Sequence, residues 1–447
     1  MATGDSKKNW EEKTQIISDE IFNESFEFKI SYDGKIPKEK LISETPKEVY
    51  SPIFNKNSDN KFFYGDNLDV LKHLLHNLDL KKRFKLIYID PPYGTNSIFF
   101  SRNQKSSYRD DLIGSHYIEF IRKRLILLRE LLSDDGSIYV HLDNNMVFEI
   151  KLIMDEIFGP QNFRGLITRK KCSTKNYTKK TYGNISDYII FYSKSDNYTW
   201  ERATIPWSDE KIKKEYPCID EKTGKRYKKV PIHAPGTRNG ETGKEWKGML
   251  PPKGKHWQYT PKKLDELDAN GEIYWSANGN PRRKVFFDKD SGIPIQDIWM
   301  DVQDSVNQNI KITGYPTEKN PLLIERIINA SSNEGDYILD CFSGSGTTLD
   351  IANQLKRKWV GIDNSFEAIQ NTFKRFFCGL EPMGNFTSKK SMPTKKSQPY
   401  LNYPLFLMKI PMSLLILIFM QTNDMKMKQP IYMKVLQKNS PFSKYLC

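Results

Sequence analysis

The sequence has few cysteines and histidines, the residues that bind zinc or form disulfides. Its 447 residues include five cysteines and six histidines, without Cys-x-x-Cys spacing and without a histidine pair near a cysteine. Neither a zinc site nor a disulfide framework is indicated, and we expect no bound metal. Unpaired cysteines and the lack of a signal peptide are typical of a reducing compartment, so we expect a cytoplasmic protein.

Long apolar segments are also absent. The strongest apolar peak, residues 412–420, is nine residues long and follows Pro411. A helix needs about 20 apolar residues to cross the hydrocarbon core of a bilayer, so no membrane span is expected.

The glycine-rich loop at residues 340–348 lacks two familiar signatures. It reads Asp-Cys-Phe-Ser-Gly-Ser-Gly-Thr-Thr, between an apolar run at 337–339 and a helical pattern at 349–355. The lysine of a P-loop is absent, as is the third glycine of a dinucleotide fingerprint. A strand, a glycine loop and a helix start still let the backbone approach a nucleotide-like cofactor closely. We therefore predict S-adenosylmethionine, which has no pyrophosphate, as the ligand of Asp340, Phe342, Ser343, Gly344, Ser345 and Gly346.

Two further acidic residues end predicted strands. Asp363 closes the run 358–363, about 20 residues after the loop, where it can accept hydrogen bonds from ribose hydroxyls. Asp66 follows the apolar run 62–64 and can meet an adenine amino group. The alternative for Asp66 is a helix N-cap, because aspartate favours that position.

The feature with the most chemical content is Asp90-Pro91-Pro92-Tyr93, directly after the apolar run 86–89. An exocyclic amine is a poor nucleophile, because its lone pair is delocalised into the base. Asp90 and the carbonyl of Pro91 can accept its two protons and aim the lone pair at a methyl donor. The prolines stiffen the segment, and Tyr93 can stack on a base swung out of the duplex, worth roughly 1 to 3 kcal/mol. The alternative is an ordinary strand-to-loop turn.

The pair Pro217-Cys218 raises a rival enzyme. Cytosine-C5 methyltransferases attack the base with a cysteine that follows a proline. This pair lies in an irregular basic block and not directly after a predicted strand of the catalytic sheet, and it leaves the Asp90 motif unexplained. We therefore disfavour that chemistry.

Positive charge dominates the composition, since 69 Lys and Arg face 55 Asp and Glu, a formal net charge of +14. Residues 164–229 contain 17 of the cations and 8 acidic residues, interleaved with tyrosines and tryptophans. Cations neutralise phosphates and aromatic rings stack on bases, so we expect this block to contact DNA. Lys170 and Lys171 are the candidates within it. The alternative is a solvated loop region.

Loops farther along the chain carry more cations. Arg238 lies in a loop rich in glycine and asparagine, and Arg282 and Arg283 follow a tight Asn-Gly-Asn-Pro turn. Arginine prefers guanine in the major groove, and cations that follow a turn suit a phosphate clamp. We expect all three to bind DNA, with solvated loop side chains as the alternative.

Together these motifs resemble the beta class of DNA amino-methyltransferases, the group that contains the modification subunits of type III restriction systems. The resemblance covers residues 62–377 and rests on the segments 64–68, 90–93, 187–192, 315–321, 340–348 and 361–365. It implies that the Asp90 motif holds a flipped adenine, that the glycine loop holds the methionine part of the cofactor, and that Asp66, Asp363 and Asn364 position adenine and ribose. Lys319-Asn320-Pro321 departs from the Lys-Pro of the family, which leaves the role of Lys319 open.

The resemblance also implies the fold and the partners. We expect a Rossmann-like α/β methyltransferase sheet, circularly permuted because the Asp90 motif precedes the glycine loop, with an inserted target-recognition domain. The expected domains are an N-terminal arm (1–60), a catalytic half (61–196), the target-recognition domain (197–313), a cofactor-binding half (314–380) and a low-order tail (381–447). Expected partners are double-stranded DNA with a flipped adenine, a nuclease subunit of a restriction system and a second copy of the chain.

The tail follows different rules from the rest of the chain. Residues 381–447 contain 8 of the 13 methionines together with lysine clusters, and they show no sustained helical or strand period. We interpret them as a disordered appendage or as out-of-frame coding after a frameshift. The alternative is an interaction tail for a nuclease.

The function predicted from the sequence is transfer of a methyl group from S-adenosylmethionine to adenine N6 in DNA, within a restriction-modification system. The resemblance favours adenine, because an aspartate at the first motif position is more typical of adenine-N6 than of cytosine-N4 enzymes. The alternatives are cytosine-N4 methylation, methylation of RNA, and an inactive DNA-binding remnant.

Overall fold

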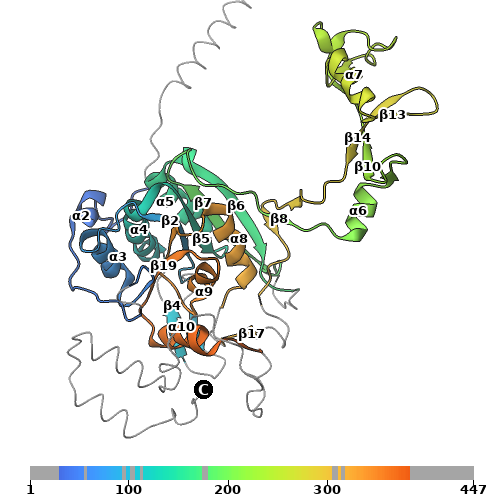
Figure 1. Cartoon of the computed structure of the whole chain (residues 1–447). Coiled ribbons are helices and arrows are strands. Elements are labelled where there is room, and N and C mark those ends of the chain that lie inside the picture. Colours follow the sequence, from blue (N-terminus) through green and yellow to red (C-terminus); the bar gives the residue numbers. More distant parts are fainter. Residues whose placement is uncertain are drawn as a thin grey trace, which may run out of the picture. The chain divides into compact units, whose positions relative to one another are not determined.

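The computed structural model describes residues 30–54, 58–92, 97–100, 106–110, 114–173, 180–304, 311–313 and 318–382. Tyr93 and residues 383–447 lie outside the described residues, and with them the stacking role of Tyr93 and the frameshift hypothesis. The chain divides into two compact units (Figure 1). We call residues 1–201 and 296–447 the sheet unit, and residues 202–295 the insert unit.

The sheet unit is built on a sheet of eight strands within the described residues, in the order β1-β19-β18-β2-β5-β7-β6-β16. The strands are β1 (Lys61–Tyr64), β2 (Phe84–Ile89), β5 (Leu132–Leu142), β6 (Phe163–Lys170), β7 (Ser186–Ser193), β16 (Ile298–Trp299), β18 (Tyr337–Asp340) and β19 (Lys358–Asp363). β1, β19, β18, β2 and β5 run parallel, whereas β7 is antiparallel to both β5 and β6. The carboxyl ends of the parallel strands therefore meet at one edge, where open α/β sheets bind their ligands.

Apolar runs in the sequence predicted most of these strands. β19 has the expected bounds, and β6 and β7 form an antiparallel pair on the far side of β5. β2 is buried along nearly its whole length, because helices cover both faces of the sheet around it. β16 extends the sheet beyond β6, and its two residues gave no periodic signal.

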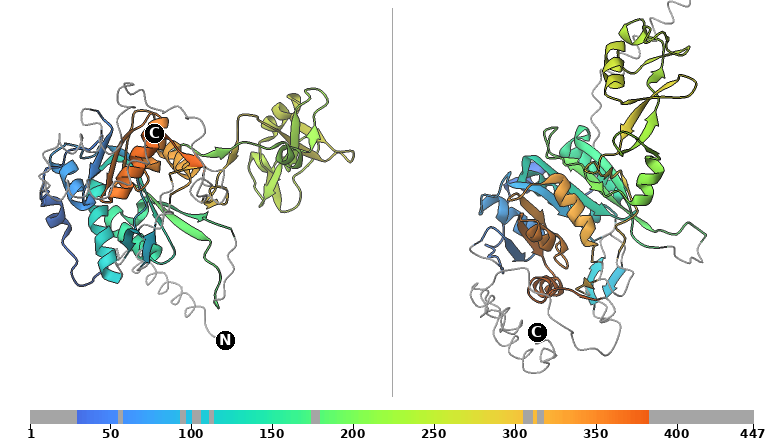
Figure 2. Two further views of the ribbon diagram at one scale, coloured as in Figure 1. Left: turned by 90° about the horizontal axis from the view of Figure 1, so that it is seen from below. Right: turned by 45° about the vertical axis from the view of Figure 1, so that its right-hand side comes forward.

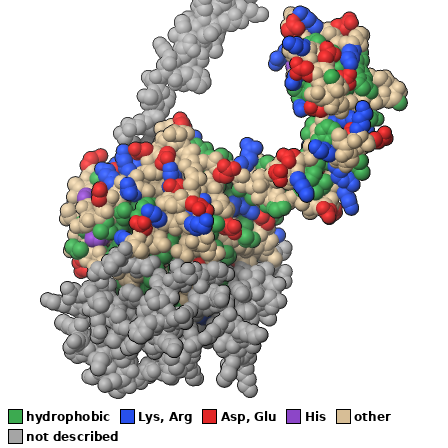
Figure 3. Space-filling view, viewed as in Figure 1, with side chains coloured by type: hydrophobic (Ala, Val, Ile, Leu, Met, Phe, Trp, Pro, Cys, Tyr) green, Lys and Arg blue, Asp and Glu red, His purple; other side chains and the backbone are tan. Residues whose placement is uncertain are grey.

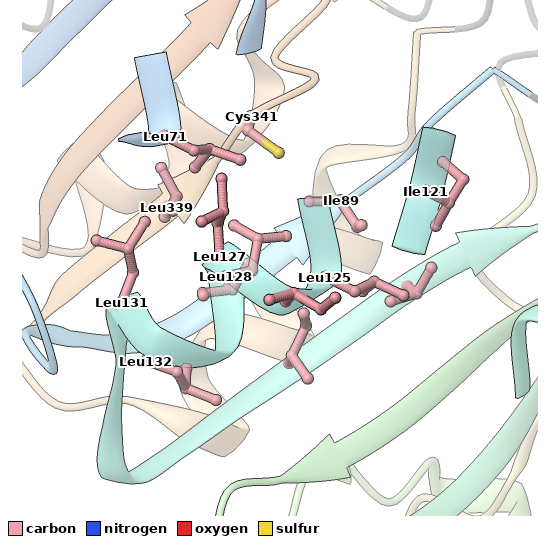
Figure 4. Close-up of a cluster of buried hydrophobic side chains, with 14 of the residues drawn as sticks. Leu71, Ile89, Ile121, Leu125, Leu127, Leu128, Leu131, Leu132, Leu339 and Cys341 are labelled. Atoms are coloured by element: carbon pink, nitrogen blue, oxygen red, sulfur yellow. The ribbon is translucent and has the colours of Figure 1, made fainter. Parts of the chain in front are cut away.

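Helices cover both faces of the sheet (Figure 2). One face carries α3 (Asn67–His76), α4 (Gly114–Leu131) and α5 (Val147–Phe158), and the other carries α8 (Pro321–Ser331), α9 (Thr347–Gln354) and α10 (Phe366–Cys378). Figure 4 shows Leu127 and Leu131 of α4 near Leu339 of β18, and all three side chains are fully buried. Each such burial contributes about 1.5 to 3 kcal/mol, so the apolar stripe of α4 holds this helix on the sheet.

The described part of the N-terminal segment, which we expected to be an arm, packs against the core. Helix α2 (Lys38–Ser43) buries Leu41 among the core residues. The Tyr32 hydroxyl donates to Glu119 of α4 at 2.5 Å, and Nζ of Lys35 lies 2.7 Å from Glu156 of α5. Pairing of these polar groups with side chains of α4 and α5 leaves no mark in the sequence. The composition of the segment therefore gave no reason to place it against the core.

The insert unit has a core of its own. Its elements are β8 (Thr204–Ile205), α6 (Asp209–Glu215), β9 (Cys218–Ile219), β10 (Arg226–Val230), β11 (His233–Pro235), the 3-10 turn η2 (Glu241–Gly243), β12 (Lys255–Trp257), α7 (Pro261–Ala269), β13 (Ile273–Trp275), β14 (Pro281–Phe286) and β15 (Ile293–Pro294). Four strands form an antiparallel sheet in the order β13-β14-β10-β9. The buried core consists of Ile232, Trp246, Trp257, Leu264, Leu267 and Ile273. The unit is narrower than the expected domain 197–313, because β16 joins the large sheet instead.

Short elements complete the sheet unit. They are the antiparallel pairs β3 (Ser97–Phe100) with β4 (Ser106–Asp110) and β17 (Lys311–Ile312) with β20 (Glu381–Pro382), and the 3-10 turn η1 (Pro160–Asn162). In the part of the chain that the structure describes, no helix is long and apolar enough to cross a membrane.

Candidate active site

Four acidic residues lie at the carboxyl ends of four neighbouring strands. Asp66 comes two residues after β1, Asp363 ends β19, Asp340 ends β18 and Asp90 follows β2. These strands are adjacent and parallel, so the four residues share one edge of the sheet. Asp90 precedes Asp340 by 250 positions in the sequence, yet their strands are neighbours, which is the permuted order that we expected.

The Asp90 motif starts directly at the end of β2. Oδ2 of Asp90 lies 2.7 Å from Nζ of Lys319, and the two side chains are only 18% and 11% exposed. A charge-assisted contact of this length fixes the orientation of the carboxylate. Pro91 is buried and Pro92 is half-buried, so the surrounding protein packs against both prolines of the motif. Lys319, whose role the sequence left open, belongs to the site.

The glycine loop between β18 and α9 has two residues in the left-handed region. Gly344 and Gly346 have φ values of 51° and 74°, which a residue with a side chain rarely adopts. The N–H of Gly344 donates to Oδ2 of Asp363 at 2.8 Å, and the N–H of Ser365 donates to Oδ1 at 2.8 Å. Asp363 therefore ties the loop to the end of the next strand.

The two serines of the loop have side chains that contact other parts of the protein. Oγ of Ser343 donates to the carbonyl of Asp340 at 2.8 Å. Oγ of Ser345 lies 3.1 Å from Oγ1 of Thr347. The carbonyl of Ser345 accepts from Nε of Arg375 at 2.8 Å. The hydroxyl groups thus shape the loop.

Two of the predicted cofactor residues lie farther out on the same edge. The ring of Phe342 is half-buried, with its centroid 6.2 Å from that of Phe120 on α4. Asn364 follows β19 and is exposed. Phe342 thus follows the end of β18 and Asn364 the end of β19.

Burial raises the pKa of two carboxyl groups at this edge. It raises the pKa of Asp340 to about 7, and repulsion from Asp90 and Asp363 adds to the shift. Burial likewise raises the pKa of Asp363 to about 6, against hydrogen bonds from the backbone N–H groups of Gly344 and Ser365. A cation bound at this edge would stabilise the ionised form of both groups.

These residues fit S-adenosylmethionine. The cofactor carries a positive sulfonium and a positive ammonium group, and both suit an edge with Asp340 and Asp363, whose pKa values burial has raised. The left-handed glycines let the loop backbone come close to a ligand, because no Cβ intervenes. The loop 340–346 and Asp363 would therefore hold the cofactor. The cofactor would supply an electrophilic methyl group.

Asp66 caps helix α3, which is the alternative that the sequence left open. Its Oδ1 accepts from the N–H of Leu68 at 2.8 Å, and its Oδ2 lies 3.6 Å from Nη2 of Arg124. Arg124 is buried and donates from Nε to Asn67 at 2.6 Å. The cap and the arginine fix the Asp66 carboxylate at the edge of the sheet, where its side chain remains 58% exposed.

A buried polar network leads toward Asp90, and most of it gave no sequence signal. Oη of Tyr88 lies 2.8 Å from Nδ1 of His141, whose Nε2 lies 3.0 Å from Oδ2 of Asp187. The same oxygen lies 3.0 Å from Nη1 of Arg169. Although burial alone would raise it, the pKa of Asp187 is held well below its usual range by His141, Arg169 and Lys319. Asp187 lies in a segment that carries the family resemblance, whereas one histidine within a strand has no spacing to interpret.

The DNA-binding candidates are divided between the two units. Lys170 and Lys171, at the end of β6, are half-buried in the sheet unit. Arg238 and Arg282 are exposed in the insert unit. The insert unit contains 20 Lys and Arg against 13 Asp and Glu, a net charge of +7, and Figure 3 shows many of these cations on its surface.

The cations at 282–284 do not form one cluster, because alternate residues of β14 face opposite sides of its sheet. Arg283 donates from Nη1 to the hydroxyl of Tyr259 at 2.6 Å, and its Nη2 lies 3.5 Å from Glu272. Nζ of Lys284 lies 2.7 Å from Asp220. Arg282 is the exposed member of the three, so the clamp that the sequence suggested is reduced to one residue.

The rival nucleophile lies in the other unit. Cys218 is in β9, where it pairs with Tyr227 of β10, and both belong to the insert unit. Asp90 and the glycine loop belong to the sheet unit. Cys218 therefore belongs to a different unit from the acidic residues at the edge of the large sheet.

Comparisons with known proteins agree with the chemistry of this edge. Residues 84–374 match the DNA methylase family. The type II methyltransferase M.EcaI of Enterobacter cloacae is 48% identical over 366 residues, which cover 80% of this chain and 80% of that protein. The Mod subunit of the type III restriction-modification enzyme StyLTI of Salmonella typhimurium is 31% identical over 332 residues, 66% of this chain and 50% of that protein.

Solved structures resemble the chain more distantly. The M1.HpyAVI complex with S-adenosylmethionine has 15% identity and a TM-score of 0.36, over 70% of this chain and 98% of that one. The cytosine-N4-specific PvuII methyltransferase has 15% identity and a TM-score of 0.42, over 75% and 93%. The family match and the relationship to M.EcaI show that this chain belongs to the DNA methylase family, whose enzymes use S-adenosylmethionine and have a Rossmann-like α/β sheet like the one described here.

Proposed function

We propose that this DNA methyltransferase acts on the N6 amino group of adenine. The observation that carries the proposal is the position of Asp90, which lies at the end of β2 next to β18 and the glycine loop, with its carboxylate held by Lys319. A carboxylate beside a methyl-donor loop can accept a proton of an exocyclic amine while the nitrogen attacks.

The chain's own residues then have separate tasks. Asp90 accepts one N–H of the amine and the carbonyl of Pro91 accepts the other, which aims the nitrogen lone pair at the methyl carbon. As the new N–C bond forms and the C–S bond breaks, positive charge grows on the nitrogen, and the Asp90 carboxylate stabilises it. The amine proton then leaves through Asp90. Tyr93 stacks on the flipped base in this proposal.

Adenine is favoured over cytosine by the aspartate at position 90, because the resemblance links that residue to adenine-N6 enzymes. Cytosine-N4 methylation uses the same geometry and the same cofactor. The names of M.EcaI and of the StyLTI Mod subunit do not state a base. The two bases are therefore separate outcomes of the experiment below.

We assign recognition of the DNA to the insert unit. It holds half of the chain's net charge of +14 in 94 of 447 residues, which favours a phosphate partner. On one face of its sheet Nζ of Lys229 lies 3.5 Å from the ring centroid of Tyr274, and Lys284 lies over Tyr227 at 5.3 Å. Register places Arg282 on the same face as these pairs. Lys170, Lys171 and Arg238 would contact further phosphates.

We also propose that the chain serves a restriction-modification system. M.EcaI is named as a type II methyltransferase, and the StyLTI and EcoP15I relatives as Mod subunits of type III restriction-modification enzymes. A nuclease that cuts the same DNA sequence when it is unmethylated would be the partner. A nuclease subunit and a second copy of the chain stay predictions.

The test is to identify the methylated base. The purified chain is incubated with methyl-labelled S-adenosylmethionine and, in separate reactions, unmethylated DNA or RNA. The nucleic acid is digested to nucleosides, and the labelled nucleosides are separated. We expect N6-methyldeoxyadenosine. Labelled N4-methyldeoxycytidine would identify cytosine N4 as the target instead of adenine N6. Label in RNA but not in DNA would overturn DNA as the substrate.

A further inference from the structure

Three consecutive residues before α8 contact three different parts of the sheet unit. Glu318 pairs with Arg375 of α10, Lys319 pairs with Asp90 after β2, and Asn320 donates from Nδ2 to the carbonyl of Gln303 at 2.7 Å. Asn320 also accepts from the N–H of Leu322 at 3.0 Å and caps α8. The segment is therefore anchored at its helix end while its two charged side chains reach to either side.

Lys319 pairs with one carboxylate and acts electrostatically on a second. Its Nζ is 2.7 Å from Oδ2 of Asp90, and its charge also acts on Asp187. Asp187 is itself fixed by Arg169 and His141, which come from two further strands of the sheet. The ammonium group thus holds the Asp90 carboxylate directly, and its charge also favours the ionised form of Asp187.

Glu318 connects to the cofactor side of the site. Its Oε1 pairs with Nη2 of Arg375, and the two side chains are 8% and 1% exposed. Arg375 donates from Nε to the carbonyl of Ser345 at 2.8 Å and from Nη2 to Oγ1 of Thr347 at 2.9 Å. The other oxygen, Oε2, accepts from the N–H of Thr313 at 2.9 Å. Glu318 is therefore one bonded step from the glycine loop.

We propose that Glu318 and Lys319 act as a clasp that sets the distance between Asp90 and the glycine loop. Adjacent residues cannot move independently, so a contact on either side restrains both. Neither residue needs to touch the substrate, and we regard both as positioning residues. This inference rests on the proposed methyl transfer, because alignment between the two halves of the site matters only if a group passes between them.

Alignment has a large effect on rate when two reactants must meet in line. A displacement of about 1 Å can lower the rate about 100-fold without loss of binding. The clasp joins parts of the chain that the permuted order separates by 250 positions, so the covalent path between them is long. The ladder between β2 and β18 brings the two strand ends together, and the buried charges of the clasp add a second connection, between side chains, beyond the last ladder pair.

The experiment compares Lys319→Met, Glu318→Gln and the double variant in the full chain. We expect about a 100-fold lower kcat for Lys319→Met, a smaller loss for Glu318→Gln, and a double variant no slower than Lys319→Met. The KM for DNA should stay within about threefold in each. Lys319→Arg should recover most of the lost rate, because it keeps the charge.

Lys81→Met is the matched control. Lys81 is 53% exposed and lies 3.9 Å from Glu130, just before β2 begins and hence at the opposite edge of the sheet. It should leave kcat, KM and the melting temperature unchanged. A control that lowers kcat as Lys319→Met does would mean that loss of any lysine acts through general charge.

The melting temperatures of the wild type, Lys319→Met, Glu318→Gln and the double variant test the clasp without any need for activity. Coupled contacts give losses in melting temperature that do not add, whereas independent contacts give additive losses. Additive effects in both kcat and melting temperature would overturn the clasp. If the wild-type chain transfers no methyl group to any base, the proposed function fails, and the melting temperatures alone decide whether the two contacts are coupled.

Discussion

The sheet unit and the insert unit treat charged side chains in opposite ways. At the edge of the large sheet Asp340 and Arg375 are 2% and 3% exposed, and the acidic groups there are held by backbone N–H groups, lysine or arginine. In the insert unit Arg238 and Arg282 are exposed. We propose that the sheet unit keeps charge at fixed positions for chemistry, whereas the insert unit offers charge to a partner.

The physical costs explain why the two patterns do not mix. A buried ion pair loses hydration on both partners, and it is kept where geometry matters more than stability. An exposed cation costs little in the free protein and contributes about 0 to 1 kcal/mol to stability. When it meets a phosphate it releases a counterion, so its contribution to binding depends strongly on salt. Substitutions in the two units should therefore change different measured quantities.

The largest effect should come from Asp90→Asn. Removal of the charge leaves the amine without its anionic acceptor, so we expect kcat to fall about 100- to 1000-fold. The affinities for S-adenosylmethionine and for DNA should stay within about threefold. Steady-state kinetics together with calorimetric titration of the cofactor would measure both.

Asp143→Asn is the matched control for that variant. Asp143 follows β5, the strand next to β2, and accepts from the N–H of Asn145 at 2.9 Å. We expect its kcat to be close to that of the wild type. An equal loss in both variants would contradict a specific role for Asp90.

The next largest effect should be confined to the insert unit. Leu264 is fully buried in its core, so Leu264→Ala should lower the free energy of unfolding of this unit by about 2 to 5 kcal/mol. DNA binding should weaken, while cofactor affinity stays unchanged because the glycine loop lies in the other unit. Leu250→Ala, at a residue that is 68% exposed, is the control. Loss of cofactor binding in Leu264→Ala would contradict the separation of tasks.

The pH dependence of cofactor binding should be intermediate in size. The pKa of Asp340 is raised to about 7 and that of Asp363 to about 6, and a cationic ligand favours both ionised forms. Affinity for S-adenosylmethionine should be about tenfold weaker at pH 6 than at pH 8. Asp340→Asn should remove most of this dependence in calorimetric titrations.

The free protein should show the opposite trend in stability. A carboxyl group whose pKa is raised on folding binds more protons in the folded than in the unfolded state, so stability is greatest below pH 4 as far as Asp340 is concerned. This contribution is lost as the pH rises from about 4 to about 7. Melting temperatures of the wild type that exceed those of Asp340→Asn equally at every pH would argue against the shift.

The smallest effects should distinguish two neighbouring arginines. Arg282→Ala should lower the slope of log affinity for DNA against log salt concentration by about 0.9, the value for one lost phosphate contact. Arg283→Ala should leave the slope unchanged and lower the melting temperature, since Arg283 donates to Tyr259 and lies near Glu272. Filter binding at several salt concentrations would decide between them, and identical slopes in both variants would exclude Arg282 as a phosphate contact.

Much of the fold could be predicted from the sequence. Apolar runs indicated four of the parallel strands, because burial on both faces of a sheet imposes a continuous apolar run. The place of the N-terminal segment could not be predicted, since Tyr32 and Lys35 are held by partners about 90 and 120 positions away. Pairing over such distances has no local pattern.

The site divides in the same way. Asp90 and the glycine loop were identified from residue types and spacing, because a strand end followed by a defined loop is a local signal. Lys319 had a position in a motif but no assigned partner, and its contact with Asp90 emerged from the fold. Arg375 lies in an amphipathic helix where an arginine is expected to face solvent, so the sequence gave no reason to place it beside Ser345.

The division of tasks between the units is tested most directly by single-turnover methyl transfer. The chain is saturated with labelled S-adenosylmethionine and DNA before the reaction is followed by rapid quench, so differences in binding no longer affect the rate. Asp90→Asn should transfer the methyl group at least about 100-fold more slowly than the wild type, and Arg282→Ala at the wild-type rate. Equal rates for Asp90→Asn and the wild type, or a chemical step slowed as much by Arg282→Ala as by Asp90→Asn, would contradict it.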